Sequence, residues 1–237
     1  MVFWTFSALF KGSATTAWPI GSGSDGQENV TGFPIYEPEA KKCQKSIEAC
    51  PTHAIEIKES KLKIDYGKCV NCQLCSDKCD SKEIRASTNY DVSTIRRGEL
   101  LPLGFKRSLH IRHVDAGSCN GCESELDAMQ NPFYDMQRLG FFFTPSPRFA
   151  DLLLVTGPVT YNMKGPLLEA YAAMPEPRFV MACGTCAVSG GTNGGGYACY
   201  NGLEGILPID IYLPGCPPNP AAIITALMTF LDRRIES

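Results

Sequence analysis

The chain has 237 residues, 44% of them hydrophobic, which suits one large or two small globular domains. Its net charge of −3 gives no indication of a nucleic-acid-binding surface. No apolar run approaches the length that is needed to cross a bilayer.

Twelve cysteines are the most informative part of the composition, and they have two general explanations. A secreted scaffold would use them for disulfides, but residues 1–6 lack the basic start of a signal peptide. Cys-x-x-Cys pairs, which occur here, indicate metal binding more often than disulfides in an intracellular chain. The pattern therefore predicts thiol ligands in a reducing cytoplasm.

Residues 1–42 are predicted to form an N-terminal amphipathic helix followed by an extended arm. Aromatic residues recur at helical spacing near the start, among them Phe3, Phe6 and Phe10. This helix would either pack on its own domain or lie at a membrane surface, where Trp and Phe are favoured. From residue 12 the arm is rich in Gly, Ser, Thr and Pro, and it is expected to contain little regular structure.

Residues 43–95 are predicted to form a small α+β ferredoxin-like unit. Apolar and polar residues alternate at 55–57 and 62–64, which indicates two short strands joined by a turn. A complete C-x₂-C-x₂-C-x₃-C run follows, with the spacing of a bacterial [4Fe–4S] ferredoxin. Its members are Cys69, Cys72, Cys75 and Cys79.

The other cysteine run of such a ferredoxin is incomplete in this chain. Its four expected positions hold Ala40, Cys43, Ser46 and Cys50. In two-cluster ferredoxins the fourth cysteine of each run binds the other cluster. One [4Fe–4S] cluster is therefore predicted on Cys50, Cys69, Cys72 and Cys75. Cys43 and Cys79 are left as neighbours, as free thiols, a disulfide or the remains of a second cluster site.

Residues 96–108 are predicted to be a basic linker, which is either solvated or in contact with lipid headgroups or a partner subunit. Residues 109–237 are predicted to be an α/β domain with a flavodoxin-like parallel sheet. Strands are expected at 109–114, 152–155, 179–181 and 209–213, and helices at 123–130, 163–174 and 220–234. Such alternation predicts an open sheet with helices on both faces.

Cysteines follow three of these predicted strands. Cys119 and Cys122 come after the first strand, Cys186 after the third, and Cys216 after the fourth. Because ligands collect outside the carboxyl ends of strands in an open α/β sheet, the four thiols are expected to converge there. An iron–sulfur cluster is favoured over zinc, since structural zinc usually uses two local C-x₂-C pairs and Cys216 stands alone.

Four blocks of the C-terminal half resemble a known family. They are Cys119-Asn-Gly-Cys122-Glu, Ser146-Pro-Arg-Phe-Ala-Asp-Leu-Leu-Leu-Val-Thr-Gly157, Gly184-Thr-Cys186-Ala-Val-Ser-Gly-Gly191 and Pro214-Gly-Cys216-Pro-Pro-Asn-Pro220. Over about residues 109–235 the chain resembles the small, electron-transfer subunit of membrane-bound group 4 [NiFe] hydrogenases. The similarity is to the formate hydrogenlyase and energy-converting type, which is related to the cluster-N2 subunit of respiratory complex I.

The N-terminal third resembles a second protein of the same complexes, their ferredoxin-like subunit. Phe3 to Pro19 looks like the arm of that subunit, and Ile64-Asp-Tyr-Gly-Lys-Cys69 looks like the approach to its second cysteine run. The chain thus resembles a fusion of two neighbouring subunits.

The resemblance implies roles for the cysteines of the C-terminal domain. Cys119, Cys122, Cys186 and Cys216 would hold a proximal [4Fe–4S] cluster, beside the nickel–iron site of a separate large subunit. Cys183 and Cys199 match no ligand position and are expected to be packing residues. The C-x₂-C spacing of the first pair favours a hydrogenase over a quinone reductase.

The resemblance also implies a function, which is to relay electrons through two [4Fe–4S] clusters for 2H⁺ + 2e⁻ ⇌ H₂. The implied partners are the [NiFe] large subunit, membrane subunits related to complex I, and a ferredoxin or formate dehydrogenase module as electron donor or acceptor. The implied location is peripheral, on the cytoplasmic face of the membrane. The chain alone would not be catalytic. Two alternatives remain open, namely a complex I-related quinone or sulfur reductase without nickel, and a zinc-stabilised scaffold without redox function.

Overall fold

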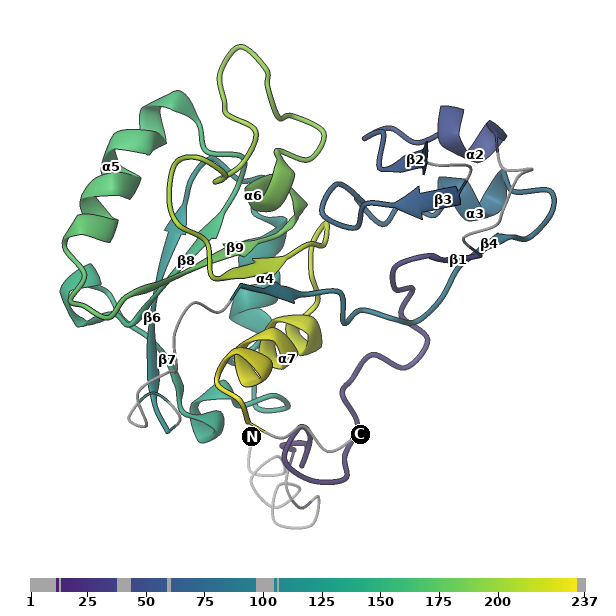
Figure 1. The fold of residues 1–237 in the computed structure, drawn as a ribbon. Coiled ribbons are helices and arrows are strands. Elements are labelled where there is room, and N and C mark those ends of the chain that lie inside the picture. Colours follow the sequence, from purple (N-terminus) through teal and green to yellow (C-terminus); the bar gives the residue numbers. More distant parts are fainter. Residues whose placement is uncertain are drawn as a thin grey trace, which may run out of the picture.

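The structure is a computed structural model that describes residues 12, 14–37, 44–58, 61–96, 105 and 107–233. The predicted N-terminal helix and most of the predicted linker lie outside these residues. Two units are evident in Figure 1, a large one built on a six-stranded sheet and a small one built on two hairpin-sized sheets.

The large unit contains a mostly parallel six-stranded sheet, in the order β5-β10-β9-β8-β6-β7. Its strands are β5 (Thr94–Ile95), β6 (Leu109–Asp115), β7 (Phe141–Phe143), β8 (Leu152–Thr156), β9 (Phe179–Cys183) and β10 (Ile211–Leu213). The last five strands are parallel, and β5 runs antiparallel to β10 at the edge. Taken in chain order, the parallel strands follow the flavodoxin arrangement 2-1-3-4-5. The predicted fold class is therefore confirmed.

Helices cover both faces of this sheet (Figure 1). They are α4 (Gly121–Ala128), α5 (Tyr161–Ala172), α6 (Thr185–Ser189) and α7 (Pro220–Phe230), with short 3₁₀ turns η2 (Met136–Leu139) and η3 (Pro147–Phe149). One core contains residues of α4 and α7, and the other contains residues of α5 and α6.

Strand β8 shows why the apolar run at 152–155 forms a central strand. Leu152 and Leu154 are buried in one core, whereas Leu153 and Val155 are buried in the other. Full burial of a leucine side chain stabilises the fold by about 1.5–3 kcal/mol, so both faces of this strand contribute. The sheet position of β8 in turn places its carboxyl end beside that of β6.

The small unit is the expected α+β arrangement of short elements. It contains α2 (Gln44–Glu48), β2 (Ile55–Lys58), β3 (Lys61–Ile64), α3 (Leu74–Asp77) and β4 (Ile84–Arg85). Strands β2 and β3 form an antiparallel hairpin, as the alternating pattern predicted. Strand β4 pairs with β1 (Ile35–Tyr36), which belongs to the arm.

The arm is extended, and it contacts both units. Near its start Trp18 is buried in the core of the large unit, and the N–H of Thr16 donates to the carbonyl of Phe133. Further along, the N–H of Gly32 donates to the carbonyl of Ser87 beside the small unit. The arm therefore ties the two units together.

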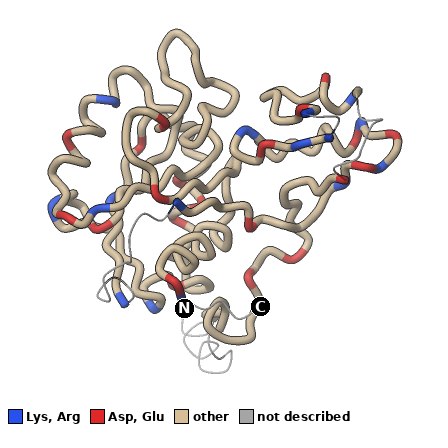
Figure 2. The backbone as a smooth tube through the Cα atoms, viewed as in Figure 1, with Lys and Arg blue, Asp and Glu red and all other residues tan. Residues whose placement is uncertain are grey.

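Some features of the fold differ from the sequence-based expectation, among them the short helix α6, which was not predicted. The strand β7, a run of three phenylalanines, was not predicted. Residues 94–95, assigned by sequence to the end of the ferredoxin-like unit, pair with β10 as β5. Charged residues of both signs are spread over the two units (Figure 2). Of the helices in the described ranges, none has the length and apolar character that a bilayer crossing requires.

Candidate metal centres

The small unit brings together the four cysteines that were predicted to hold its cluster. A small cavity is lined by Cys50, Cys69, Cys72 and Cys75, together with apolar side chains such as Ile55 and Ile64. Cys75 lies on α3, Cys69 and Cys72 lie in the loop between β3 and α3, and Cys50 follows α2. Cys75 is buried and Cys72 is exposed, so the cavity lies near the surface.

The backbone around this cavity is shaped to face the sulfurs. Asn71 and Gln73 have left-handed backbone conformations, with φ of 55° and 62°, which curl the loop around the cavity. The N–H of Asn71 lies 3.4 Å from the sulfur of Cys69, and the N–H of Ala54 lies 3.2 Å from the sulfur of Cys50. Such N–H···S contacts stabilise a charged thiolate and tune the potential of iron–sulfur groups.

The pKa values of these thiols show that the site suits a cationic group. Burial raises the pKa of Cys69 to about 11, and the neighbouring Cys75, Cys50 and Cys72 raise it further by repulsion between thiolates. Burial also raises the pKa of Cys75. Thiolates are the form that binds metal. Bound metal supplies the positive charge that stabilises grouped thiolates, and the soft donor set fits an iron–sulfur cluster.

The remaining ferredoxin-type positions have other roles in the described residues. Cys79 is buried and disulfide-bonded. The hydroxyl of Ser46 is fully buried and donates to the carbonyl of Cys75 at 2.8 Å. Cys43 and Ala40 lie outside the described residues. The hydroxyl of Ser46 therefore serves packing of the loop, in line with its low value as a ligand.

The large unit brings together its own set of four cysteines, at the carboxyl ends of the parallel strands. Cys119 lies in the loop after β6, Cys122 in α4, Cys186 in α6, and Cys216 in the loop after β10. The convergence that the sequence predicted is thus present. Cys119 and Cys216 are exposed, whereas Cys122 is buried.

Electrostatics shows how closely these four sulfurs are grouped. Burial raises the pKa of Cys122 to about 12, with added repulsion from Glu123 and from the other three cysteines of the set. Burial raises the pKa of Cys186 to about 11, with Cys216 and Cys119 adding to the shift. The same argument applies as in the small unit, because bound metal would balance the charge of four thiolates here.

Two glycines make room for these sulfurs. Gly184 has a φ of +92°, and a Cβ there would lie 2.6 Å from the sulfur of Cys122. Gly191 has a φ of +59°, and a Cβ there would lie 2.9 Å from the sulfur of Cys186. Any side chain at either position would displace the neighbouring sulfur from the set, so both positions require glycine.

The two cysteine sets differ from a site for one metal ion. Among the described residues, no three Cys, His, Asp or Glu side chains are grouped closely enough to hold a single metal ion. A [4Fe–4S] cluster takes each cysteine on a different iron, so its four ligands stand farther apart than the ligands of one ion do.

Cys183 and Cys199 are both buried, as expected of packing residues. Cys183 is the last residue of β9. The thiol of Cys199 donates to the carbonyl of Asn193 at 2.9 Å. Neither residue belongs to the four-sulfur sets, although Cys199 is close enough to add to the pKa shift of Cys186.

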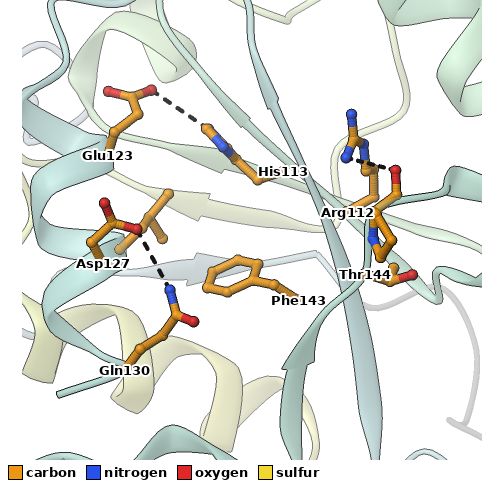
Figure 3. Close-up of a pocket in the computed structure, with 9 residues that line it drawn as sticks. Arg112, His113, Glu123, Asp127, Gln130, Phe143 and Thr144 are labelled. Carbon is orange, nitrogen blue, oxygen red and sulfur yellow. Dashed lines mark hydrogen bonds and ion pairs between the residues drawn. The ribbon is translucent and has the colours of Figure 1, made fainter.

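A polar network beside Cys122 was not predicted from the sequence. The carboxylate of Glu123 accepts hydrogen bonds from the hydroxyls of Ser118, at 2.7 Å, and Thr156. The Nε2 of His113 lies 3.5 Å from Glu123 Oε1 (Figure 3). Burial lowers the pKa of His113. His113 lies on β6, Thr156 on the neighbouring strand β8 and Glu123 on α4, so the network forms only where α4 packs beside these two strands.

This network forms one wall of a cavity of about 340 Å³. Figure 3 shows Glu123 and Asp127 on α4 at one side of the cavity, with Arg112 and Phe143 across it. Glu123 also lies in the first turn of α4, where the helix dipole favours a negative charge. Its hydrogen bonds and position together account for a partly buried carboxylate next to a cysteine.

Comparison with known proteins gives an independent view of the C-terminal half. The family model for the 20 Kd subunit of NADH ubiquinone oxidoreductase matches residues 119–230. Formate hydrogenlyase subunit 7 of Escherichia coli is 45% identical over 145 residues, which are 61% of this chain and 57% of that protein. The chain thus spans little more than half the length of this relative.

Two archaeal relatives are covered more completely. A probable membrane-bound hydrogenase subunit of Pyrococcus furiosus is 40% identical over 54% of this chain and 76% of that protein. An uncharacterized protein of Methanocaldococcus jannaschii is 42% identical over 55% of this chain and 87% of that protein.

Solved structures resemble the chain over a similar extent. The membrane-bound sulfane sulfur reductase, an archaeal respiratory membrane complex, contains a chain with a TM-score of 0.49 and 32% identity, covering 54% of this chain and 71% of that one. An NAD⁺-reducing [NiFe]-hydrogenase contains one with a TM-score of 0.44 and 20% identity, covering 55% and 96%. Through residues 119–230 and relatives covered over most of their length, the chain belongs to the family of the 20 Kd subunit of NADH ubiquinone oxidoreductase, which includes hydrogenase subunits.

Proposed function

We propose that this chain is the electron-transfer subunit of a membrane-bound [NiFe] hydrogenase, with one [4Fe–4S] cluster at each of its two cysteine sets. The observation that carries the proposal is the assembly of both predicted sets, one around a cavity and one at the carboxyl ends of the parallel strands. When bound, each cluster would supply a carrier of one electron.

The residues of the chain would divide the work of holding these groups. Cys50, Cys69, Cys72 and Cys75 would bind the cluster of the small unit, and Cys119, Cys122, Cys186 and Cys216 that of the large unit. Backbone N–H groups near the sulfurs would stabilise the thiolates, as that of Ala54 does for Cys50. Buried neighbours such as Ile64 would exclude water from the small site.

The exposed sulfurs indicate where partners would approach. Cys119 and Cys216 are exposed at the carboxyl end of the sheet, which is where the [NiFe] large subunit would cover the site. Cys72 is exposed on the small unit, where a ferredoxin or formate dehydrogenase module would exchange electrons. Membrane subunits related to complex I would complete an assembly on the cytoplasmic face, with this chain as a peripheral part.

A chain with this fold and these cysteines could have two other functions. In a complex I-related quinone or sulfur reductase, both cysteine sets would keep their clusters, and the large partner would lack nickel. In a zinc-stabilised scaffold, the sets would hold no iron and the chain would have no redox role.

Metal analysis of the native complex, purified through this chain, tests the proposal. We expect nickel together with abundant iron and acid-labile sulfide. Iron and sulfide without nickel would refute the hydrogenase assignment and favour the quinone or sulfur reductase. Zinc without iron, and no visible iron–sulfur absorbance, would refute electron transfer altogether.

A further inference from the structure

Thr185 lies at a junction between the two cysteine sets. It is fully buried, and it opens α6 directly before Cys186. In Figure 1 the loop of the small unit between β3 and α3 reaches towards α6, and Thr185 is at this contact. No ferredoxin-type or C-x₂-C pattern marks this residue, so its role is visible only in the structure.

The hydroxyl of Thr185 makes two hydrogen bonds, one to each side of the junction. It donates to the carbonyl of Cys69 in the small unit at 2.9 Å. It accepts from the N–H of Gly215 in the large unit at 3.0 Å. The backbone N–H of Thr185 also donates to the carbonyl of Gly215 at 2.8 Å. One side chain therefore links three loops that each carry a predicted ligand.

The loops concerned are those of Cys69, Cys186 and Cys216, because Gly215 directly precedes Cys216. The carbonyl of Cys69 is hydrogen-bonded to the side chain of Thr185, which is covalently joined to Cys186. The same hydroxyl is hydrogen-bonded to Gly215, the residue before Cys216. We propose that Thr185 is a positioning residue that fixes the small-unit site against the large-unit site for electron exchange. This inference rests on the proposed function.

The surroundings explain why a single hydroxyl matters at this point. The contact is close, since a Cβ on Gly67 would lie 3.3 Å from a methyl group of Val188 on α6. Beside it lies a groove of about 430 Å³, lined by Lys63 and Tyr66 of the small unit and by Tyr212 of the large unit. The units thus meet at the Thr185 junction and separate next to it, so this junction sets their local spacing.

The units remain attached to each other when this hydroxyl is removed. Trp18 anchors the arm in the large unit, and the arm pairs with the small unit through β1. Strand β5, which follows the small unit, pairs with β10. A Thr185→Val variant is therefore expected to fold with both units in place. The loop that contains Cys69 would no longer be held in a fixed position against α6.

Hydrogen exchange of the purified chain tests the hydrogen bonds themselves, independently of any activity. In Thr185→Val the amide of Gly215 loses its acceptor and is expected to exchange faster. Thr185→Ser keeps a hydroxyl and should restore slow exchange. Thr225→Val is the matched control, because Thr225 is a buried threonine on α7 that lines a different cavity, with Trp18 and Tyr90 and without any cysteine. Unchanged exchange at Gly215 in Thr185→Val would overturn the inference.

Electron exchange in the assembled complex tests the positioning role. One electron, supplied by dithionite, would pass from the cluster held at one set to the cluster held at the other, and rapid-freeze electron paramagnetic resonance would follow both signals. We expect about tenfold slower exchange in Thr185→Val, with wild-type iron and sulfide content and with rescue by Thr185→Ser. Equal rates in wild type and Thr185→Val would refute the inference. Absence of iron from the wild type would instead refute the proposed function.

Discussion

Replacement of Gly184 by alanine is predicted to empty the large-unit site while leaving the small-unit site intact. Gly184 has φ 92° and ψ 151°, a region that is essentially restricted to glycine, and a side chain there costs about 1–3 kcal/mol. The new Cβ would also lie 2.6 Å from the sulfur of Cys122. Overpacking of this kind costs about 1–3 kcal/mol more. Rotation of the sulfur relieves the clash, but it removes that sulfur from its set.

The assay is iron and acid-labile sulfide per chain, together with urea unfolding of the metal-free protein. Gly184→Ala should lose about half of the iron, because only one of two clusters would be affected. Gly205→Ala is the control for backbone strain alone, since Gly205 has a φ of +75° and no atom within 4 Å of its Cβ position. Gly165→Ala, within α5 and with open space around it, should be stabilising by about 0.5–1 kcal/mol.

The combination of variants separates the two causes. If Gly205→Ala loses as much iron as Gly184→Ala does, backbone strain and not the clash with Cys122 is responsible. Full iron and sulfide in Gly184→Ala would refute the assignment of Cys122 as a ligand.

Three further predictions concern other parts of the molecule. Cys216→Ala should abolish hydrogenase turnover of the assembled complex and halve the iron bound by this chain, whereas Cys199→Ala should keep both; undiminished turnover would contradict the ligand role. Trp18→Ala should destabilise the chain by about 3–5 kcal/mol in urea unfolding, since this side chain is buried in the large core. Burial raises the pKa of Asp210 above its ordinary value of 3.8, so stability should fall as the pH rises from 3.8 through the folded pKa. Asp210→Asn should remove this dependence and be stabilising at neutral pH; equal stability at neutral pH would show that burial of the carboxylate has no cost.

Much of the fold follows from local patterns in the sequence. The run at 152–155 was predicted as a strand buried on both faces, and it is β8 at the centre of the sheet. The helix predicted at 220–234 begins at Pro220 as α7, where the side chain of Asn219 accepts a hydrogen bond from the N–H of Ala222 at 2.7 Å. Strand β7 escaped prediction because three consecutive phenylalanines show neither alternation nor helical spacing.

The candidate sites were accessible from sequence to different degrees. Three cysteines of the small unit lie within seven residues, and their spacing, together with the ligand exchange of two-cluster ferredoxins that adds Cys50, indicated a common site. Those of the large unit converge only because parallel strands end at the same edge of the sheet. Thr185 and Glu123 stand inside blocks that resemble the known family, but no pattern indicated their contacts, because each contact depends on which segments the sheet order brings together.

The connection of both sites within one chain changes what is required to hold them together. Two separate proteins need an interface of about 1,200–2,000 Å² for stable association. Linkage converts docking into an intramolecular step with a high effective concentration, so a small contact is enough. Here the arm and strand β5 provide the linkage. The hydrogen bonds of Thr185 then have only to favour one position of the Cys69 loop relative to α6, and a single buried hydroxyl is sufficient for this.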